Sequence, residues 1–278
     1  MSLPSPASLF DISGKVIIVT GASGALTGCA ADYLATQGAR VVYLGRSQEK
    51  LDACLERIRQ QHPGAEVMAT AADIADRAAL EAARDAILAR WGRIDALLNG
   101  AGGNQAGATI TPDKTFADLD FEAFQQVVDL NLHGTVLPSL VFTPALLESG
   151  SASIVNYSSA SSAQAITRVV GYSAAKAAVD NFTRWLAVDL GRRTRGTVRV
   201  NALVPGFFLA EQNRKLLTQE DGTFTERGRT ICEQTPFGRF GEPEELNGAL
   251  HYLVSEASRF VTGTTLVVDG GFAAFSGV

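Results

Sequence analysis

A tyrosine and a lysine four residues apart, Tyr172 and Lys176, have the types and the spacing for acid–base chemistry. On a helix this spacing puts both side chains on one face, so a single ligand can touch both. A free phenol, with a pKa of about 10, is a poor base at neutral pH, but a neighbouring ammonium favours the phenolate and lowers that pKa. Tyr172 is therefore a candidate general acid/base, although such a pair also occurs by chance on structural helices.

Two further polar sites could join this pair. Ser158 and Ser159 end the apolar run that precedes Tyr172, and a hydroxyl there could bind the substrate oxygen beside the phenol. Asn131 falls inside a long expected helix, where asparagine is mildly unfavourable. Holding a water next to Lys176 would explain this asparagine, and a helix irregularity is the alternative.

A glycine-rich turn, Gly21–Gly28, follows the first apolar run and leads into a helix. Backbone N–H groups in such a turn, together with the helix N-terminus, can bind a pyrophosphate at close range. An ordinary tight turn explains the glycines alone equally well. The position after the first strand favours a dinucleotide site, with Gly21, Ser23, Gly24, Ala25 and Leu26 as its predicted contacts.

The ends of the third and fourth apolar runs support a dinucleotide site. Asp73, followed by Ile74, could accept a hydrogen bond from an adenine amino group. Small residues follow the fourth run, where a ribose must lie close to the backbone, and the predicted contacts there are Asn99, Gly100, Ala101 and Gly102. Each of these two segments taken alone could be a simple strand-end turn.

The end of the second run bears on the choice of cofactor. NAD enzymes usually place Asp or Glu there for the ribose 2′-hydroxyl, whereas an arginine accommodates a 2′-phosphate. Here Gly45 is followed by Arg46, so no carboxylate opposes a phosphate and a guanidinium can bind it. This pattern favours NADP(H). The alternative is NAD(H), with Arg46 stacked on the adenine.

Short apolar runs alternate with longer amphipathic segments, and the runs have the near-continuous Val/Ile/Leu content of strands buried on both faces. The predicted strands are Lys15–Thr20, Arg40–Leu44, Glu66–Ala71, Ile94–Leu98, Ser153–Tyr157, Val198–Val204 and Thr265–Val268. The predicted helices are Leu26–Gln37, Gln48–Gln61, Arg77–Trp91, Phe121–Leu147, Tyr172–Arg193 and Pro243–Leu253. The alternation predicts an α/β fold, a doubly wound, seven-stranded parallel sheet flanked by helices, in a single domain over residues 1–278.

Residues 207–241 break this alternation after a strand. Because ligands of open α/β sheets bind at the carboxyl ends of the strands, a long insertion there favours a helical substrate lid. The alternative is a solvent-facing excursion without a role.

Composition narrows the class of protein. The net charge is -5 and the basic residues are scattered, unlike the basic face of a nucleic-acid binder. The three cysteines are far apart, so free thiols in a reducing compartment are expected rather than disulfides or a metal site. The N-terminus does not resemble a secretory signal, and no apolar stretch is expected to span a membrane. A cytoplasmic protein is expected.

Together these features resemble the short-chain dehydrogenase/reductase family, over nearly the whole chain. The matching residues are Thr20–Gly21, Asp73, Asn99–Gly102, Asn131, Ser159, Tyr172, Lys176, Pro205–Gly206 and Val268–Gly271. The resemblance implies an NAD(P)-binding Rossmann fold and hydride transfer between a nicotinamide and a carbonyl or alcohol carbon. One departure is local: the family's glycines at positions 25 and 27 are replaced by Ala25 and Thr27, so the pyrophosphate turn must differ.

The resemblance also assigns roles to individual residues. Asn131, Ser159, Tyr172 and Lys176 would form a catalytic tetrad. Tyr172 would donate or accept the proton, Ser159 would orient the substrate, and Lys176 would bind the ribose and tune the tyrosine. Asn131 would support a relay water. Tyr172, Lys176, Pro205 and Gly206 would also contact the cofactor, and the assembly would be a homotetramer.

The 207–241 segment, the NGAGGNQ run at Asn99–Gln105 and the C-terminal DGGFAAFSGV are similar to the D-mannonate oxidoreductase (fructuronate reductase) branch of the family. This similarity implies that a small sugar acid is the substrate. A sugar acid needs a cation for its carboxylate and polar partners for its hydroxyls. The candidate residues are Asn104, Ser159, Arg168, Gln212, Asn213 and Arg214.

Three functions remain open from the sequence. The first is the hexuronate reductase that the branch implies. The second is a reductase of another sugar, polyol or 3-oxoacyl thioester, although the polar residues of the 207–241 segment disfavour a long acyl chain. The third is a dinucleotide-binding protein without catalytic activity, a class that usually has a damaged tetrad.

Overall fold

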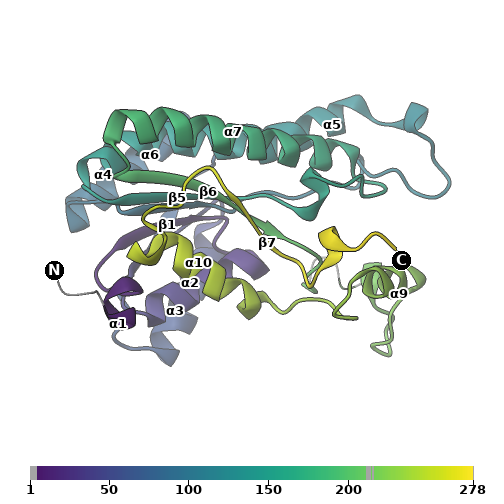
Figure 1. The fold of residues 1–278 in the computed structure, drawn as a ribbon, viewed down its shortest axis with the longest axis horizontal. Helices are drawn as coiled ribbons and strands as arrows, with labels where there is room; N and C mark the ends of the chain where they lie inside the picture. Colours follow the sequence, from purple (N-terminus) through teal and green to yellow (C-terminus); the bar gives the residue numbers. More distant parts are fainter. Residues whose placement is uncertain (1–4, 211–213, 215, 278) are drawn as a thin grey trace.

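The structure, a computed structural model, describes residues 5–210, 214 and 216–277. Its centre is a parallel sheet with helices packed around it (Figure 1). The seven described strands follow the order β3-β2-β1-β4-β5-β6-β7. The strands are β1 Val16–Thr20, β2 Arg40–Gly45, β3 Val67–Ala71, β4 Ala96–Asn99, β5 Ala152–Tyr157, β6 Val198–Pro205 and β7 Thr265–Val268. Every predicted strand is present, with ends shifted by at most two residues, and the predicted fold class is confirmed.

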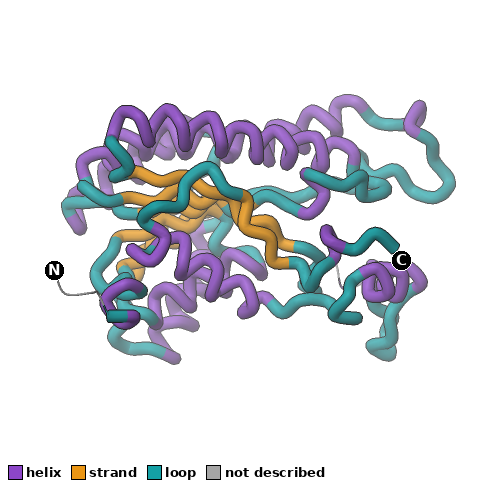
Figure 2. Tube along the Cα trace, viewed as in Figure 1, coloured by secondary structure: helices purple, strands orange, loops and turns teal. Residues whose placement is uncertain are grey.

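Helices cover both faces of this sheet (Figure 2). The α-helices are α1 Pro6–Leu9, α2 Ala25–Thr36, α3 Gln48–Gln61, α4 Arg77–Trp91, α5 Phe121–Val128, α6 Gly134–Glu148, α7 Val170–Thr194, α9 Glu226–Gln234 and α10 Asn247–Val254. Short 3-10 helices are η1 Phe116–Asp118, η3 Ala160–Ser162, η4 Pro243–Leu246, η5 Glu256–Ser258 and η6 Phe272–Ala274. Local sequence sets several of the ends: Ser47 and Asp76 accept backbone N–H groups as N-caps of α3 and α4.

Two hydrophobic cores, one on each face, hold the helices to the sheet. Successive residues of β1 alternate between them, because side chains of a strand point to opposite faces in turn. Ile17 and Val19 pack with residues of α2, α3 and α10, whereas Val16 and Ile18 pack with residues of α4, α6 and α7. Both sets are fully buried, which explains why the strands are apolar without interruption.

The predicted helix Phe121–Leu147 is interrupted. Between α5 and α6 the chain makes a π-helical turn, η2, over Asp129–His133. The whole run Phe121–Glu148 has the length and mean hydropathy (1.3) of a membrane span, contrary to the sequence expectation. Half of its apolar window is nevertheless buried inside the fold, where α6 packs on β4 and β5. The run therefore has the pattern of a helix packed against a sheet.

The two ends of the 207–241 segment lie next to each other beside the sheet. Phe208 forms an isolated parallel bridge with Gly241, whose N–H donates to the carbonyl of Phe207 at 2.9 Å. Inside the excursion, Leu217, Ile231, Cys232 and Phe240 form a separate small core. The described part of the predicted lid, which carries α9, is therefore a packed subdomain closed at its base.

Strand order places the functional edge of the sheet. Strands β1 and β4 lie side by side at the centre of the sheet. From them the later strands follow outward on the two sides, β2 and β3 beyond β1, and β5, β6 and β7 beyond β4. Ligands of doubly wound sheets bind outside the carboxyl ends of the strands at such a switch point. The turn after β1 and the loop after β4 are the two segments that meet there.

Candidate active site

A cleft of about 220 Å³ lies at the switch point between β1 and β4. It is lined by Gly21, Gly24, Ala25, Leu26, Thr27, Gly100, Ala101, Gly102, Gly103, Tyr157, Ser158, Ser159, Tyr172, Lys176, Pro205 and Gly206. The fold thus brings the predicted glycine turn, the loop after β4 and three of the four predicted tetrad residues into one cavity.

The glycine turn is held in a shape that leaves a helix end open to the cleft. Gly21 has a positive φ of 70°, and a Cβ at this position would lie 2.8 Å from Cα of Ala101, so both backbone and space require glycine. The N–H of Gly24 donates to the carbonyl of Gly21 at 2.8 Å. Among the described residues no side chain caps the N-terminus of α2, which leaves its first N–H groups for an anionic ligand.

Two threonines fasten this turn. The Thr20 hydroxyl accepts hydrogen bonds from the N–H groups of Gly100 at 3.0 Å and Ala101 at 3.1 Å, which joins the ends of β1 and β4. The Thr27 hydroxyl donates to the carbonyl of Gly21 at 2.5 Å. Thr27 is one of the two residues that depart from the family motif, and its hydroxyl closes the turn locally.

The reacting groups converge on the other wall of the cleft. The Lys176 ammonium lies 5.5 Å from the centre of the Tyr172 ring, on the same face of α7, as the spacing predicts. Its Nζ donates to the carbonyl of Tyr157 at 2.7 Å, which fixes it at the end of β5. Ser159 hydrogen-bonds to the Tyr172 side chain, whereas the Ser158 hydroxyl donates to the carbonyl of Lys176 at 3.4 Å. This geometry supports the preference for Ser159.

Burial dominates the electrostatics of this group. Desolvation raises the pKa of Tyr172, and the hydrogen bond with Ser159 opposes that rise. In the protein without cofactor the net shift of this pKa is therefore upward, not downward as expected from the sequence. Lys176 is only 3% exposed, and burial lowers its pKa to about 8 against the opposing effect of Asp180. The phenol is accordingly protonated at neutral pH.

Asn131 lies within the π-helical turn, so the helix irregularity that the sequence left open does exist. Its side chain is fully buried, and its amide nitrogen donates to the carbonyls of Gly103 at 2.7 Å and Val127 at 2.8 Å. Its oxygen accepts from the N–H of Gly103 at 3.1 Å. Both amide protons are thus committed to backbone carbonyls. Through these bonds Asn131 holds the loop after β4 in place.

Several predicted cofactor contacts lie outside the cleft lining. The Asn99 side chain is 1% exposed and donates to Ser139 Oγ and Asn156 Oδ1, both at 2.9 Å, so only its backbone is left to meet a ligand. Ile74 is buried in the core. Asp73 is exposed, and its Oδ1 accepts the N–H of Ala75 at 2.9 Å. Ser23 and Arg46 are exposed at the ends of β1 and β2.

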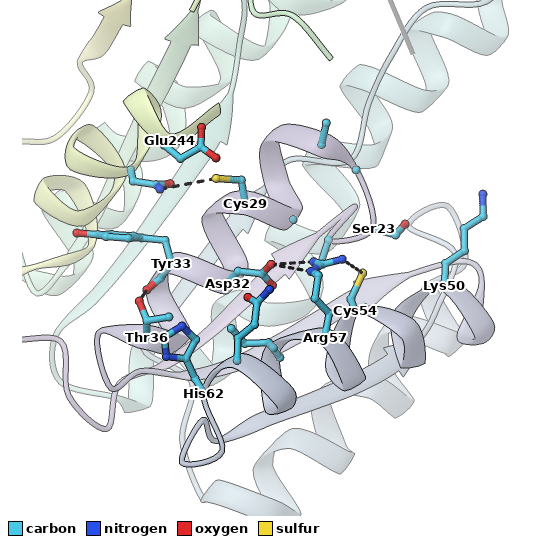
Figure 3. Close-up of a pocket in the computed structure, with 17 residues that line it drawn as sticks. Ser23, Cys29, Asp32, Tyr33, Thr36, Lys50, Cys54, Arg57, His62 and Glu244 are labelled. Carbon is cyan, nitrogen blue, oxygen red and sulfur yellow. Dashed lines mark hydrogen bonds and ion pairs between the residues drawn. The ribbon is translucent and has the colours of Figure 1, made fainter. Parts of the chain in front are cut away.

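A larger pocket of about 780 Å³ lies between α2, α3 and η4, next to the glycine turn (Figure 3). The ion pair between Asp32 and Arg57, at 2.7 Å, connects α2 to α3 within it. Ser23 is at the end of this pocket that borders the turn. No member of the predicted tetrad lines it, so the reacting groups belong to the smaller cleft.

The predicted substrate residues divide into three groups. Ser159 lines the cleft. Asn104 is exposed and donates to Thr109 at 2.8 Å, and Arg168 is half-buried on the loop before α7. Arg214 is exposed in the lid, whereas Gln212 and Asn213 lie outside the described residues.

Sequence reasoning missed two contributors. Asn156 binds Asn99 and donates to Thr183 at 2.8 Å, linking β4, β5 and α7 under the cleft. Arg227 of α9 donates to the Thr167 hydroxyl at 3.3 Å, next to Arg168. A buried asparagine in an apolar strand is a usable sequence signal for the first. No local pattern indicates the second.

Comparisons with known proteins place this fold and cleft among the Rossmann-type oxidoreductases. A family model described as enoyl-(acyl carrier protein) reductase matches residues 21–273. The chain belongs to the short-chain dehydrogenase/reductase family.

Similar proteins include sugar-acid enzymes. UxuB of Bacillus subtilis, an uncharacterized oxidoreductase, is 43% identical, covering 96% of this chain and 98% of that protein. A proposed D-mannonate oxidoreductase from Haemophilus influenza, solved with bound NAD, is 38% identical with a TM-score of 0.90, covering 99% and 100% of the two chains. A gluconate 5-dehydrogenase from Burkholderia cenocepacia, solved with NADP and tartrate, is 30% identical with a TM-score of 0.85, covering 98% and 100%.

Proposed function

We propose that this protein reduces the keto group of a hexuronate, converting D-fructuronate to D-mannonate, with NADP(H) favoured over NAD(H) as the hydride donor. The observation that carries the proposal is the convergence of Tyr172, Ser159 and Lys176 beside the glycine turn. The similarity to a proposed D-mannonate oxidoreductase supports the choice of substrate.

The residues of the cleft fit a dinucleotide. The N-terminus of α2, which begins at the exposed Ala25, offers its first backbone N–H groups to a pyrophosphate. Arg46, exposed at the end of β2, offers a guanidinium to a 2′-phosphate. When bound, the reduced dinucleotide supplies the hydride for the keto carbon. Lys176, fixed by the carbonyl of Tyr157, is the residue placed to hold a ribose hydroxyl.

The chain's own part in the reaction is proton transfer. The Ser159 hydroxyl and the Tyr172 phenol bind the keto oxygen, and Tyr172 donates its proton to that oxygen as negative charge develops on it. The alcohol leaves as product, and the phenolate regains a proton from solvent. Because burial keeps the phenol protonated, the ground state of the site suits reduction. The nearby Lys176 ammonium stabilises the phenolate that forms.

A second substrate is 5-keto-D-gluconate, which the similarity to a gluconate 5-dehydrogenase favours. The two keto acids are epimers at the carbon beside the carboxylate. Selection between them therefore depends on how the carboxylate end is held, rather than on Tyr172 and Ser159.

Cofactor oxidation tests this function directly. Purified protein is supplied with NADPH or NADH and with D-fructuronate or 5-keto-D-gluconate in separate reactions. Faster turnover of D-fructuronate supports the first proposal, faster turnover of 5-keto-D-gluconate supports the second, and no turnover of either rejects both.

Substitution of the proton donor tests the chemistry. Tyr172→Phe is expected to lower kcat by roughly a hundredfold to ten-thousandfold, because a general acid is lost. Tyr252→Phe on α10, outside the cleft, is the matched control and should keep wild-type turnover. Equal rates for Tyr172→Phe and wild type would rule out Tyr172 as the proton donor and remove the proposed mechanism.

We also propose a cytoplasmic homotetramer with a small-molecule substrate and no membrane or nucleic-acid partner. Exposed Trp185 (63%) and Val188 (61%) on α7 support association through that helix. Analytical ultracentrifugation checks the assembly, and Trp185→Glu should lower the sedimentation coefficient.

A further inference from the structure

Two arginines from distant parts of the chain meet beside the segment that leads into α7. Arg168 lies four residues before Tyr172, and Arg227 lies in the first turn of α9 within the lid. The guanidinium of Arg227 donates to the Thr167 hydroxyl at 3.3 Å, which brings it next to Arg168. Both arginines are half-buried. This hydrogen bond joins the lid to the loop before α7 and leaves two like charges near each other.

This pair lacks a counter-charge in the part of the chain that the structure describes. Neither guanidinium forms an ion pair there with a carboxylate. Burial lowers the pKa of Arg227, and the charge of Arg168 lowers it further, with no acidic group opposing them. Arg227 also occupies the first turn of α9, where the helix dipole disfavours a cation. An anion bound between the two arginines would relieve each of these costs.

The backbone around Arg168 is specialised as well. Arg168 has a positive φ of 79°, a conformation that residues with a side chain seldom adopt. Its carbonyl accepts the N–H of Ile110 at 3.0 Å, which joins this loop to the loop after β4. Strained residues of this kind persist where the surrounding structure holds them, and they are frequent at ligand sites.

The position of the pair identifies its ligand. The loop before α7 also meets the C-terminal segment, since Gln164 Nε2 donates to the carbonyl of Ala273 at 2.9 Å. The pair is therefore on the β5–α7 side of the switch point, where Tyr172 and Ser159 act. The predicted phosphate contacts, Gly24 and Arg46, follow β1 and β2. This position favours the substrate over the dinucleotide as the source of an anion at the arginine pair.

We propose that Arg168 and Arg227 jointly bind the carboxylate of the substrate and make the enzyme selective for acidic over neutral sugars. Two guanidiniums can bind both carboxylate oxygens, which is the geometry that arginine provides best. This inference rests on the proposed function, because it names the part of the site that recognises the sugar acid. Since Arg227 belongs to the lid, carboxylate binding would also hold the lid against the reacting helix.

The test compares an acid with its neutral counterpart. Arg227→Gln and Arg168→Gln are each expected to lower kcat/KM for D-fructuronate by about ten- to a hundredfold, mostly through KM, because a hydrogen bond to a charged group is lost. The kcat/KM of the same variants for D-fructose, which carries an alcohol in place of the carboxylate, should change by less than about threefold. Arg229→Gln, on the same helix and bonded to the carbonyl of Phe224, is the matched control and should behave as wild type.

Thermal unfolding without ligand separates recognition from a structural role. Removing one of two like charges that have no carboxylate partner among the described residues should leave Tm unchanged or raise it, whereas loss of a structural contact would lower it. Unchanged kcat/KM for D-fructuronate in both variants, or equal losses with D-fructose, would overturn the proposal.

Failure of the proposed function is recognised separately. If wild-type protein turns over no keto acid, calorimetric titration with D-mannonate still tests the pair. Binding that is lost in Arg168→Gln and Arg227→Gln but kept in Arg229→Gln supports the anion site. Binding that persists in all three variants, or is absent from wild type, rejects it.

Discussion

The methyl group of Thr27 occupies the space that a side chain at position 100 would need. A Cβ built on Gly100 would overlap Cγ2 of Thr27 well inside van der Waals contact. The short-chain dehydrogenase/reductase resemblance expects glycine at position 27, and the threonine found there fits because position 100 is a glycine. Gly100 therefore leaves the space that the methyl group of Thr27 needs. The altered turn can for this reason pack against the loop after β4 at the cleft.

Gly100→Ala should weaken cofactor binding by about tenfold or more and destabilise the fold by about 1–3 kcal/mol, because the added methyl overpacks the turn. Adding Thr27→Ser removes the clashing methyl but keeps the hydroxyl bond to Gly21, and should restore most of both losses. Cofactor affinity is measured by fluorescence titration and stability by urea unfolding. Strictly additive effects in this double-mutant cycle would contradict the pairing.

Asn131→Ala should lower the free energy of unfolding by about 1–3 kcal/mol, because buried backbone groups of Gly103 and Val127 lose their partners. The loop after β4 would also lose its anchor, so KM for the cofactor should rise. Asn104→Ala, at an exposed asparagine of the same loop, is the control. Wild-type stability and KM in Asn131→Ala would show that these hydrogen bonds are not what holds the loop.

Lys176→Met should change how stability depends on pH. The lysine pKa is about 8 in the folded protein against 10.5 when unperturbed, so between these values the unfolded state binds more protons. The contribution of Lys176 to the free energy of unfolding of wild type therefore rises with pH between these two values, by up to about 1.4 kcal/mol per pH unit. The free energy of unfolding of the variant should exceed that of wild type most below pH 8, and this difference should shrink towards pH 10.5.

Urea unfolding of both proteins over this pH range, without cofactor, gives the difference directly. Other titrating groups cancel because they are present in both proteins. Parallel stability profiles would mean that burial does not shift the lysine.

Arg46→Ala should lower kcat/KM for NADPH by roughly ten- to a hundredfold and leave NADH nearly unchanged, since only NADPH carries the 2′-phosphate. Arg40→Ala, at the opposite end of β2, is the control for loss of a surface cation. An unaltered ratio of the two cofactors in Arg46→Ala would reject Arg46 as the phosphate partner.

The sequence alone determined the features that depend on neighbouring residues. Uninterrupted apolar runs predicted strands buried on both faces, and their alternation with helices predicted the sheet. The spacing of Tyr172 and Lys176 predicted a shared helix face, because residues four positions apart on an α-helix lie on the same face. The glycine turn was found for the same reason, since Gly21 needs a positive φ within the turn itself.

Only the tertiary structure decided which distant side chains share one volume. Asn99 looked like a ligand contact, but its amide is used inside the sheet by Asn156 and Ser139. The partnership of Thr27 with Gly100, and of Arg168 with Arg227, joins residues that no local pattern relates. Packing and charge interactions depend on distances in space between residues that can be far apart in the chain. The local sequence therefore does not show them, and only the folded structure does.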